Sequence, residues 1–145
     1  MIKAFFNLRI GALLLAVIMP GLVSGCGSAP ARQPLAIEQA KKADLEAHRA
    51  LRDGDLLRAR ELFRKAMLMQ QALDNLPASA MAAINLSTVS HKLADDESAL
   101  GLLEGILADR SAQMPSDLRM AAAFRKGIIL ADHGKVAAAE AALQQ

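Results

Sequence analysis

Hydrophobic and polar residues follow helical spacing in the chain from Leu35 onward. Apolar residues recur there at intervals of three and four positions, as they do on one face of an α-helix. Alanine, leucine, arginine and glutamate, which favour helices, dominate the same region, and little in it favours strands. The pattern predicts an all-α domain over residues 35–145.

Five clusters of turn-forming residues interrupt this pattern. They contain glycine, proline, asparagine or aspartate, which end a helix or cap the next one. The clusters lie at residues 53–55, 75–77, 94–96, 114–116 and 132–134. They divide the domain into about six helices, which we expect to form three pairs.

The three predicted pairs carry residues of the same size at the same spacing. Each pair has a small residue in the middle of its first helix and another early in its second helix, followed four positions later by a large apolar residue. These positions, 40 residues apart from pair to pair, are Ala47, Ser87 and Gly127; Ala59, Ala99 and Ala139; and Phe63, Leu103 and Leu143. Small residues let paired helices approach closely, and the large ones fill the space between pairs.

This spacing resembles the tetratricopeptide repeat, a family of helical repeat proteins. The resemblance implies a right-handed α-solenoid of about three helix-turn-helix repeats, at about residues 38–75, 78–114 and 116–145. The period of 40 residues exceeds the usual length of about 34, which we attribute to longer helices and loops around residues 67–79 and 109–116. Ala94 also replaces the turn glycine of the second repeat. The short last helix could dock as a minimal cap, but we expect either a longer array that continues after residue 145 or a partner that covers its edge.

The resemblance also implies where a partner binds, because these proteins use the concave surface lined by the first helices of their repeats. An extended or helical protein segment is the expected ligand. A clamp for a terminal carboxylate is not expected, because Asp44, His48 and Ala121 replace residues that the clamp needs. The candidate groove residues are Met81, Ile84, Asn85, Thr88, His91, Phe124, Arg125 and Ile128.

Residues 1–25 have the organisation of a secretory signal peptide. Lys3 and Arg9 precede an apolar run that ends near Pro20, and small residues follow. The apolar stretch of about 14 residues is shorter than the roughly 20 that a membrane span needs. We therefore expect this leader to be cleaved.

The segment before Cys26, Leu-Val-Ser-Gly, resembles the lipobox of bacterial lipoproteins. The resemblance implies that the Cys26 thiol receives diacylglycerol and that its freed amine receives an acyl chain, which would anchor the protein to a membrane. In a cell with two membranes, Gly27, which is not aspartate, implies sorting to the outer membrane, facing the periplasm. In a cell with one membrane, the protein would lie on the outer face of that membrane. Residues 26–34 contain two prolines and no apolar periodicity, so we expect a flexible tether.

Charge and motif content argue against several function classes. Lys3 and Arg9 account for the net charge of +2, so the part after the leader is neutral and lacks the positive field that attracts nucleic acid. No phosphate-binding loop, nucleophile motif or paired carboxylates with a matching base occur, so no enzyme and no cofactor are expected. The three histidines, His48, His91 and His133, occupy different repeat positions, which predicts solvated side chains and no metal site.

These observations predict a lipid-anchored envelope lipoprotein that acts as a scaffold for protein–protein interaction. Its partner would be an envelope protein or a peptide segment, and the lipid on Cys26 would attach it to the membrane. The alternative is an accessory or N-terminal region of a larger enzyme or of a secretion or transport system.

Overall fold

The computed structural model describes residues 32–144, and these residues are all-helical with no strand. The leader, Cys26 and most of the predicted tether lie outside the described residues. The all-α prediction is confirmed. In chain order the helices are α2 (Arg32–Arg52), α3 (Leu56–Ala72), α4 (Leu76–Lys92), α5 (Asp96–Ala108), α6 (Ser116–Asp132) and α7 (Val136–Leu143).

Two boundaries differ from the sequence prediction. Helix α2 begins at Arg32, three residues before the expected start, and includes Pro34. A proline fits in the first turn because the amides there have no partner within the helix. For the same reason Pro77 lies inside α4, and the break predicted at residues 75–77 falls at residues 73–75.

Four of the five connections are three-residue turns of one design. The middle residue has a positive φ, and the next residue donates its N–H to a carbonyl five residues back, which is a Schellman motif. That last residue also serves as the N-cap of the following helix. The N-cap residues of α3 to α7 lie 20 positions apart and are Asp55, Asn75, Asp95, Pro115 and Lys135.

The middle residues of these turns differ in how well they tolerate a positive φ. Gly54 and Gly134 adopt it without steric cost, whereas Asp74 (φ 52°) and Ala94 (φ 59°) carry a Cβ in the left-handed region. The connection from α5 to α6 is the exception, since it spans residues 109–115 and its residue Met114 is buried. The sequence predicted longer helices and loops at residues 67–79, but these residues form the end of α3, a three-residue turn and the start of α4. The 40-residue period therefore owes nothing to a long loop in this segment.

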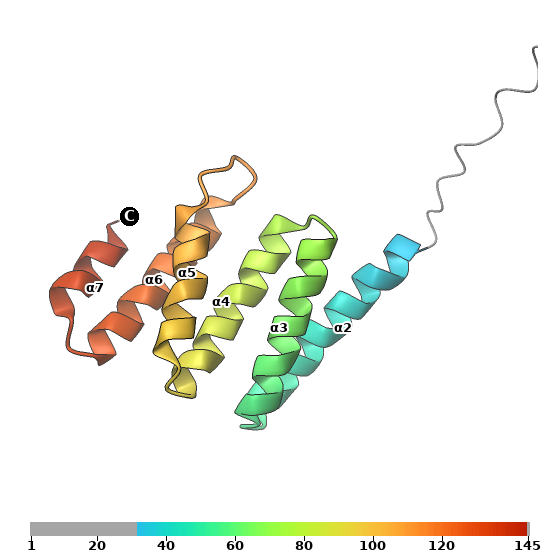
Figure 1. Cartoon of the computed structure of the whole chain (residues 1–145), viewed down its shortest axis with the longest axis horizontal. Coiled ribbons are helices and arrows are strands. Elements are labelled where there is room, and N and C mark those ends of the chain that lie inside the picture. Colours follow the sequence, from blue (N-terminus) through green and yellow to red (C-terminus); the bar gives the residue numbers. More distant parts are fainter. Residues whose placement is uncertain (1–31, 145) are drawn as a thin grey trace, which may run out of the picture. The chain divides into compact units, whose positions relative to one another are not determined.

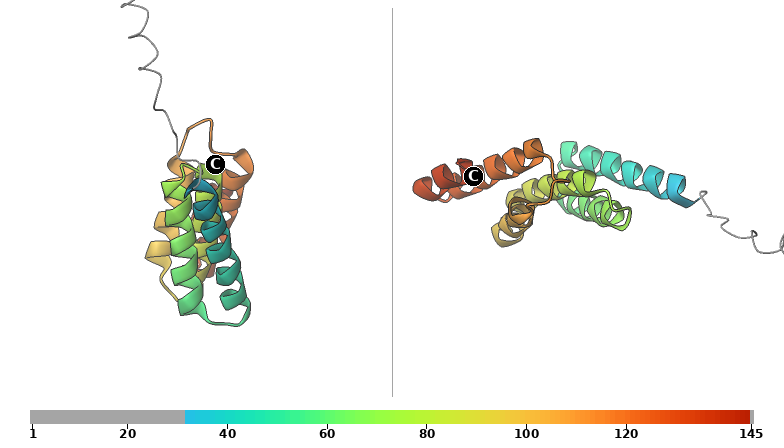
Figure 2. Two further views of the ribbon diagram at one scale, coloured as in Figure 1. Left: turned by 90° about the vertical axis from the view of Figure 1, so that its right-hand side faces the viewer. Right: turned by 90° about the horizontal axis from the view of Figure 1, so that it is seen from above.

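Each helix packs against the next one in the chain, and α4 also packs against α6. Figures 1 and 2 show the helices following one another side by side from α2 to α7. The pairs are therefore α2 with α3, α4 with α5, and α6 with α7. We call the contact between the first two pairs the first junction and the contact between the last two the second junction.

The residues predicted to set helix spacing lie in the core. Ala47, Ser87 and Gly127 are buried, and a Cβ on Gly127 would lie 3.3 Å from Leu143 Cδ2, so α6 and α7 meet closely there. Phe63 and Leu103, 40 residues apart, are fully buried at the first and second junctions. Helix pairs that repeat every 40 residues, with equivalent residues buried, give a helical repeat-like fold.

Within residues 32–144, no helix is both long enough and apolar enough to cross a membrane.

Candidate functional site

The residues predicted to line the groove lie on α4 and α6. Met81 is 46% exposed, and Asn85, Thr88, Arg125 and Ile128 are half-buried. Asn85 and Arg125 are 40 residues apart, as are Thr88 and Ile128, so they occupy equivalent positions on the two helices. These five residues lie on a surface formed by the first helices of two successive pairs.

Two of the predicted groove residues lie elsewhere. Ile84 is only 6% exposed and packs in the core with Leu118 and Ala122, so its side chain cannot contact a partner. Phe124, at the equivalent position of α6, is 59% exposed. Because this position in α4 faces the next helix pair, Phe124 points away from α4. The prediction failed here because helical spacing alone does not distinguish a groove position from one that the next pair covers.

A hollow of about 130 Å³ lies beside Met81. Lys41 and Asp44 of α2 and Gln70 of α3 line it together with Met81. Its volume is well below the roughly 300–1,000 Å³ of a small-molecule site but leaves room for a side chain. The hollow therefore extends the α4 and α6 surface to α2 and gives it a mixed polar and apolar lining.

Arg125 is the charged residue among the five that lie on α4 and α6. Its Nε atom is shielded from solvent and has no hydrogen-bond partner among the described residues. A shielded donor without a partner is costly, and a carboxylate or carbonyl oxygen of a bound segment would reach it only after the half-buried Arg125 side chain turned outward. Arg125 is thus suited to orient a ligand that lies across α6.

A larger hollow, of about 350 Å³, lies between α3, α4 and α5. Gly101, Gly105, Met67 and Met114 contribute to its mainly apolar lining, and Asp109 is its one ionisable residue. None of the predicted site residues lines it. It offers apolar contact but no arrangement of groups for chemistry.

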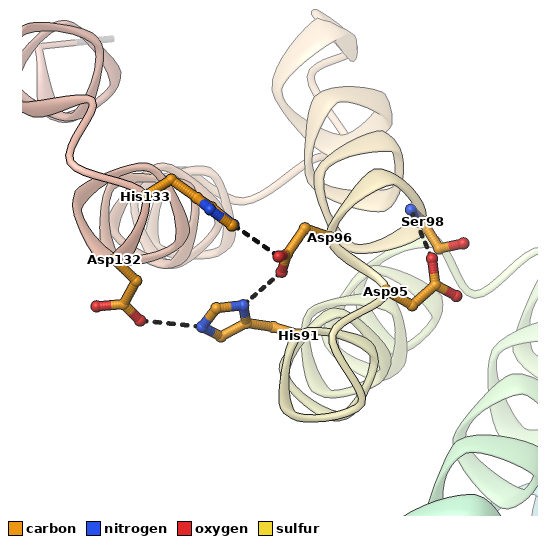
Figure 3. A network of polar contacts seen from close by, with 6 residues as sticks. All are labelled: His91, Asp95, Asp96, Ser98, Asp132 and His133. Carbon is orange, nitrogen blue, oxygen red and sulfur yellow. Dashed lines mark hydrogen bonds and ion pairs between the residues drawn. The ribbon is translucent and has the colours of Figure 1, made fainter.

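His91, the eighth predicted groove residue, belongs to a polar network at the second junction (Figure 3). Its Nδ1 lies 2.5 Å from Asp96 Oδ1 and its Nε2 lies 3.0 Å from Asp132 Oδ2. The other oxygen of Asp96 lies 2.6 Å from His133 Nε2. Helix α4 supplies His91, α5 supplies Asp96, and the end of α6 supplies Asp132 and His133. The network therefore joins the second helix pair to the third.

This geometry calls for a charged His91. Both ring nitrogens face carboxylates, and only the imidazolium has an N–H at each nitrogen to donate. The hydrogen bond to Asp96, aided by the one to Asp132 and opposed by burial, raises the pKa of His91 above its ordinary 6.5. Hydrogen bonds from His91 and then His133 lower the pKa of Asp96 below 3.8.

The helix ends favour the same charges. Asp96 is the first residue of α5, where a helix stabilises negative charge, and His91 lies in the last turn of α4, where it stabilises positive charge. Asp132 is the last residue of α6, an unfavourable place for a carboxylate, and His91 compensates it. The backbone thus supports an ion-paired network.

The prediction of solvated histidines is wrong for His91, whose side chain is 22% exposed. His91 and His133 do occupy different positions in their repeats, as the sequence indicated. The sequence did not indicate that one carboxylate, that of Asp96, contacts both rings. The available signal was that His91 and Asp132, and Asp96 and His133, are separated by nearly one 40-residue period at neighbouring turns. Residues about 40 positions apart that lie in or next to a turn come together at the same end of two neighbouring helix pairs.

The network offers charge and hydrogen bonds between two helix pairs. The described residues include no group of three or more His, Cys, Asp or Glu side chains placed to hold a metal ion. Nearby Ser98 donates its backbone N–H to Asp95, which caps α5 (Figure 3). No contact between a hydroxyl and either networked histidine occurs among the described residues. The arrangement fits a structural contact between helix pairs.

The chain matches no protein-family model, no curated protein and no solved structure.

Proposed function

We propose that this protein is a lipid-anchored scaffold of the bacterial envelope whose first helices bind a segment of another protein. The observation that carries the proposal is the surface of Met81, Asn85, Thr88, Arg125 and Ile128, with the hollow beside Met81. It combines an exposed apolar side chain with polar groups that can fix the orientation of a ligand.

The proposed architecture is a right-handed α-solenoid of the tetratricopeptide type. Its support is the recurrence of buried small residues and of fully buried Phe63 and Leu103 at a spacing of 40 residues. In such arrays the first helices line the concave side, which exposes a long surface to a ligand. The proposal assigns α2, α4 and α6 to that side.

The proposed ligand is an extended or helical protein segment. An apolar side chain of the segment would enter the hollow between Met81 and Lys41, and an oxygen acceptor would pair with Arg125. Interface affinity usually depends on a few such anchors, with polar neighbours that set specificity. A nucleic acid ligand is disfavoured by the neutral charge of the part that follows the leader.

Site-specific photo-crosslinking in intact cells tests the binding surface. A photoreactive residue at Met81, which is 46% exposed, is expected to capture a defined envelope protein. The matched control is the same residue at Leu68 of α3, which is 53% exposed and lies opposite the buried residues of that helix. Equal capture at both positions, or none at Met81, would overturn the proposed surface.

The proposed anchor is tested separately by labelling cells with a palmitate analogue. Wild-type protein is expected to take up label and fractionate with the outer membrane, and the Cys26→Ser variant is expected to take up none. Label retained by the variant would contradict lipidation at Cys26. The crosslinking result does not depend on this outcome.

A further inference from the structure

One face of α2 exposes leucines among charged residues. The buried face of this helix consists of Ala40, Ala43, Ala47 and Ala50. On the opposite side, residues spaced three and four positions apart form a second stripe that is exposed throughout. We call it the outer stripe, and its members are Leu35, Glu38, Lys42, Leu45, Arg49 and Arg52. Leu35 is 64% exposed and Leu45 58%, so α2 presents two large apolar side chains on the side opposite its core face.

The outer stripe differs from the same helix face in α6. Lys42 has Ala122 as its equivalent there, 80 positions later, and Arg49 has Ile129. Both equivalents are 0% exposed and belong to a core cluster with residues of α4 and α5. In α2 the stripe alternates leucines with charges, so it is neither a core face nor a wholly charged one. Leucine mixed with lysine and arginine is typical of a helix that lies at a lipid–water interface.

The outer stripe carries a positive charge. Its charged residues are Glu38, Lys42, Arg49 and Arg52. Glu38 lies 3.9 Å from Lys41, and Lys42 lies 4.0 Å from Glu46, in exposed pairs that contribute little to stability. Lysine and arginine can extend their charged groups to lipid phosphates while their stems and the leucines contact less polar groups. An anionic phospholipid surface therefore complements this stripe in charge and in polarity.

The proposed anchor places a membrane close to this stripe. Six peptide bonds join Cys26 to Arg32, the first residue of α2. A chain of that length reaches about 20 Å at most, so a lipid on Cys26 keeps the start of α2 within that distance of the membrane. Such confinement gives the membrane a high effective concentration at the stripe, and a weak contact is then sufficient.

We propose that the outer stripe of α2 lies against the anionic phospholipid surface of the membrane that holds the lipid of Cys26. The inference rests on the proposed lipidation, and the exposed leucines and the positive charge of the stripe select the lipid surface as its occupant. The hollow beside Met81 takes Lys41 and Asp44 from α2 and none of the stripe residues. A protein segment can therefore occupy that hollow while α2 lies on the membrane.

Fluorescence quenching in vesicles tests this contact on the lipidated protein. Protein from cells grown with the palmitate analogue is reconstituted into vesicles of phosphatidylethanolamine and phosphatidylglycerol that contain a spin-labelled quencher lipid. Cys26 is the only native cysteine, so a fluorophore on Leu45→Cys reports one position, and unsubstituted protein controls for labelling of Cys26. The matched control is Val136→Cys of α7, since the two native side chains are 58% and 59% exposed. We expect lipid quenching at position 45 to exceed that at position 136 at least about threefold.

A second labelled position separates docking from tethering alone. Leu35 lies three residues after the start of α2, and Leu45 lies ten residues, about 15 Å, farther along the helix. A domain that is only tethered brings position 35 near the lipid but not position 45. Docking of the outer stripe brings both positions to the surface, so strong lipid quenching is expected for Leu35→Cys and for Leu45→Cys.

Charge reversal tests whether anionic lipid is the partner. Lys42→Glu with Arg49→Glu is expected to reduce lipid quenching at position 45 at least about twofold, because the stripe then repels the surface. Lys92→Glu with Lys135→Glu makes the same change in net charge on α4 and in the turn before α7, and is the matched control. All four native side chains are exposed, so circular dichroism is expected to show unchanged helix content.

The palmitate label on the same protein distinguishes failure of the docking from failure of the anchor. With label present, equal quenching at positions 45 and 136, quenching at position 35 alone, or quenching unchanged by the charge reversal would overturn the docking and leave the anchor intact. Absence of label would overturn the anchor and this inference together. A fluorophore at position 45 that is shielded from aqueous iodide yet not quenched by the lipid would overturn the docking and assign the stripe to a second copy of the chain.

Discussion

The two junctions between helix pairs use the same positions with opposite chemistry. At the first junction Leu51, Leu56 and Leu93 pack against the apolar cluster around Phe63. Forty residues later the equivalent positions are His91, Asp96 and His133, which form the polar network. One backbone geometry therefore accommodates either an apolar trio or an ion-paired one.

The difference shows what each junction depends on. Apolar contact is insensitive to protonation, so the contacts of Leu51, Leu56 and Leu93 at the first junction should hold at any moderate pH. The second requires a charged His91 between two ionised carboxylates. Polar trios of this kind are often no more stable than apolar ones of similar size, so their distinguishing property is the response to pH.

The largest expected effect on the free energy of unfolding comes from removing a buried side chain at the second junction. Leu103→Ala removes a fully buried side chain and is expected to lower the free energy of unfolding by about 2–5 kcal/mol. The equivalent substitution Leu143→Ala, at a residue 57% exposed, is expected to cost less than about 1 kcal/mol. Urea denaturation of dilute protein compares them. Equal costs would mean that the two positions are not in equivalent surroundings.

The next effect is a dependence of stability on pH that resides in the second junction. The pKa of His91 is raised, so its contribution is complete below pH 6.5 and is lost as the pH rises through the higher folded value. The pKa of Asp96 is lowered, so its contribution is present above pH 3.8 and is lost as the pH falls through the lower folded value. The network thus stabilises most between these limits.

The variant Asp96→Asn tests this window. It removes the carboxylate that faces both histidines and is expected to reduce the loss of stability as the pH rises above 6.5. Thermal unfolding across this range provides the measurement, with Asp95→Asn as a control for removing a neighbouring charge. If the melting temperature of Asp96→Asn falls with pH as steeply as that of wild type, the pH dependence of stability comes from groups outside this network.

Converting the second junction into a copy of the first sharpens the comparison further. The triple variant His91→Leu, Asp96→Leu and His133→Leu is expected to keep the helix content and to match or exceed the wild-type stability at neutral pH. Its pH slope above pH 6.5 should be smaller than that of wild type. Loss of folding would mean that the junctions are not interchangeable.

The smallest expected effect concerns the turns that precede α3 and α5. Ala94→Gly relieves a positive φ of 59° and is expected to raise the free energy of unfolding by about 0.5–1 kcal/mol. Gly54→Ala places a Cβ at a φ of 79° and is expected to lower it by about 1–2 kcal/mol. Calorimetry of both variants, with opposite shifts in melting temperature, checks the shared turn design.

Sequence spacing predicted much of the fold because local rules decide it. Helix propensity, the N-caps at Asp55 and Asp95 and the glycine turns act over a few residues, and the 40-residue recurrence predicted the buried alanines. The α2 start was missed because proline is neutral in a first turn.

The candidate site was predicted less completely because it depends on contacts between pairs. Met81, Asn85 and Thr88 lie on a common helix surface, as their spacing indicated. Ile84 and Phe124 were misplaced because only the neighbouring pair decides which side of a helix is covered. The bridge by Asp96 arises between segments one period apart, which spacing within a helix cannot reveal.

The most direct test of the contrast between the junctions is an NMR titration of the His91 ring. We expect the His91 pKa to lie above 6.5 in the wild-type protein, with both ring nitrogens protonated below it, and to be lower in Asp96→Asn. A wild-type His91 that titrates at or below 6.5, or one whose pKa is unchanged by Asp96→Asn, would contradict the ion-paired second junction.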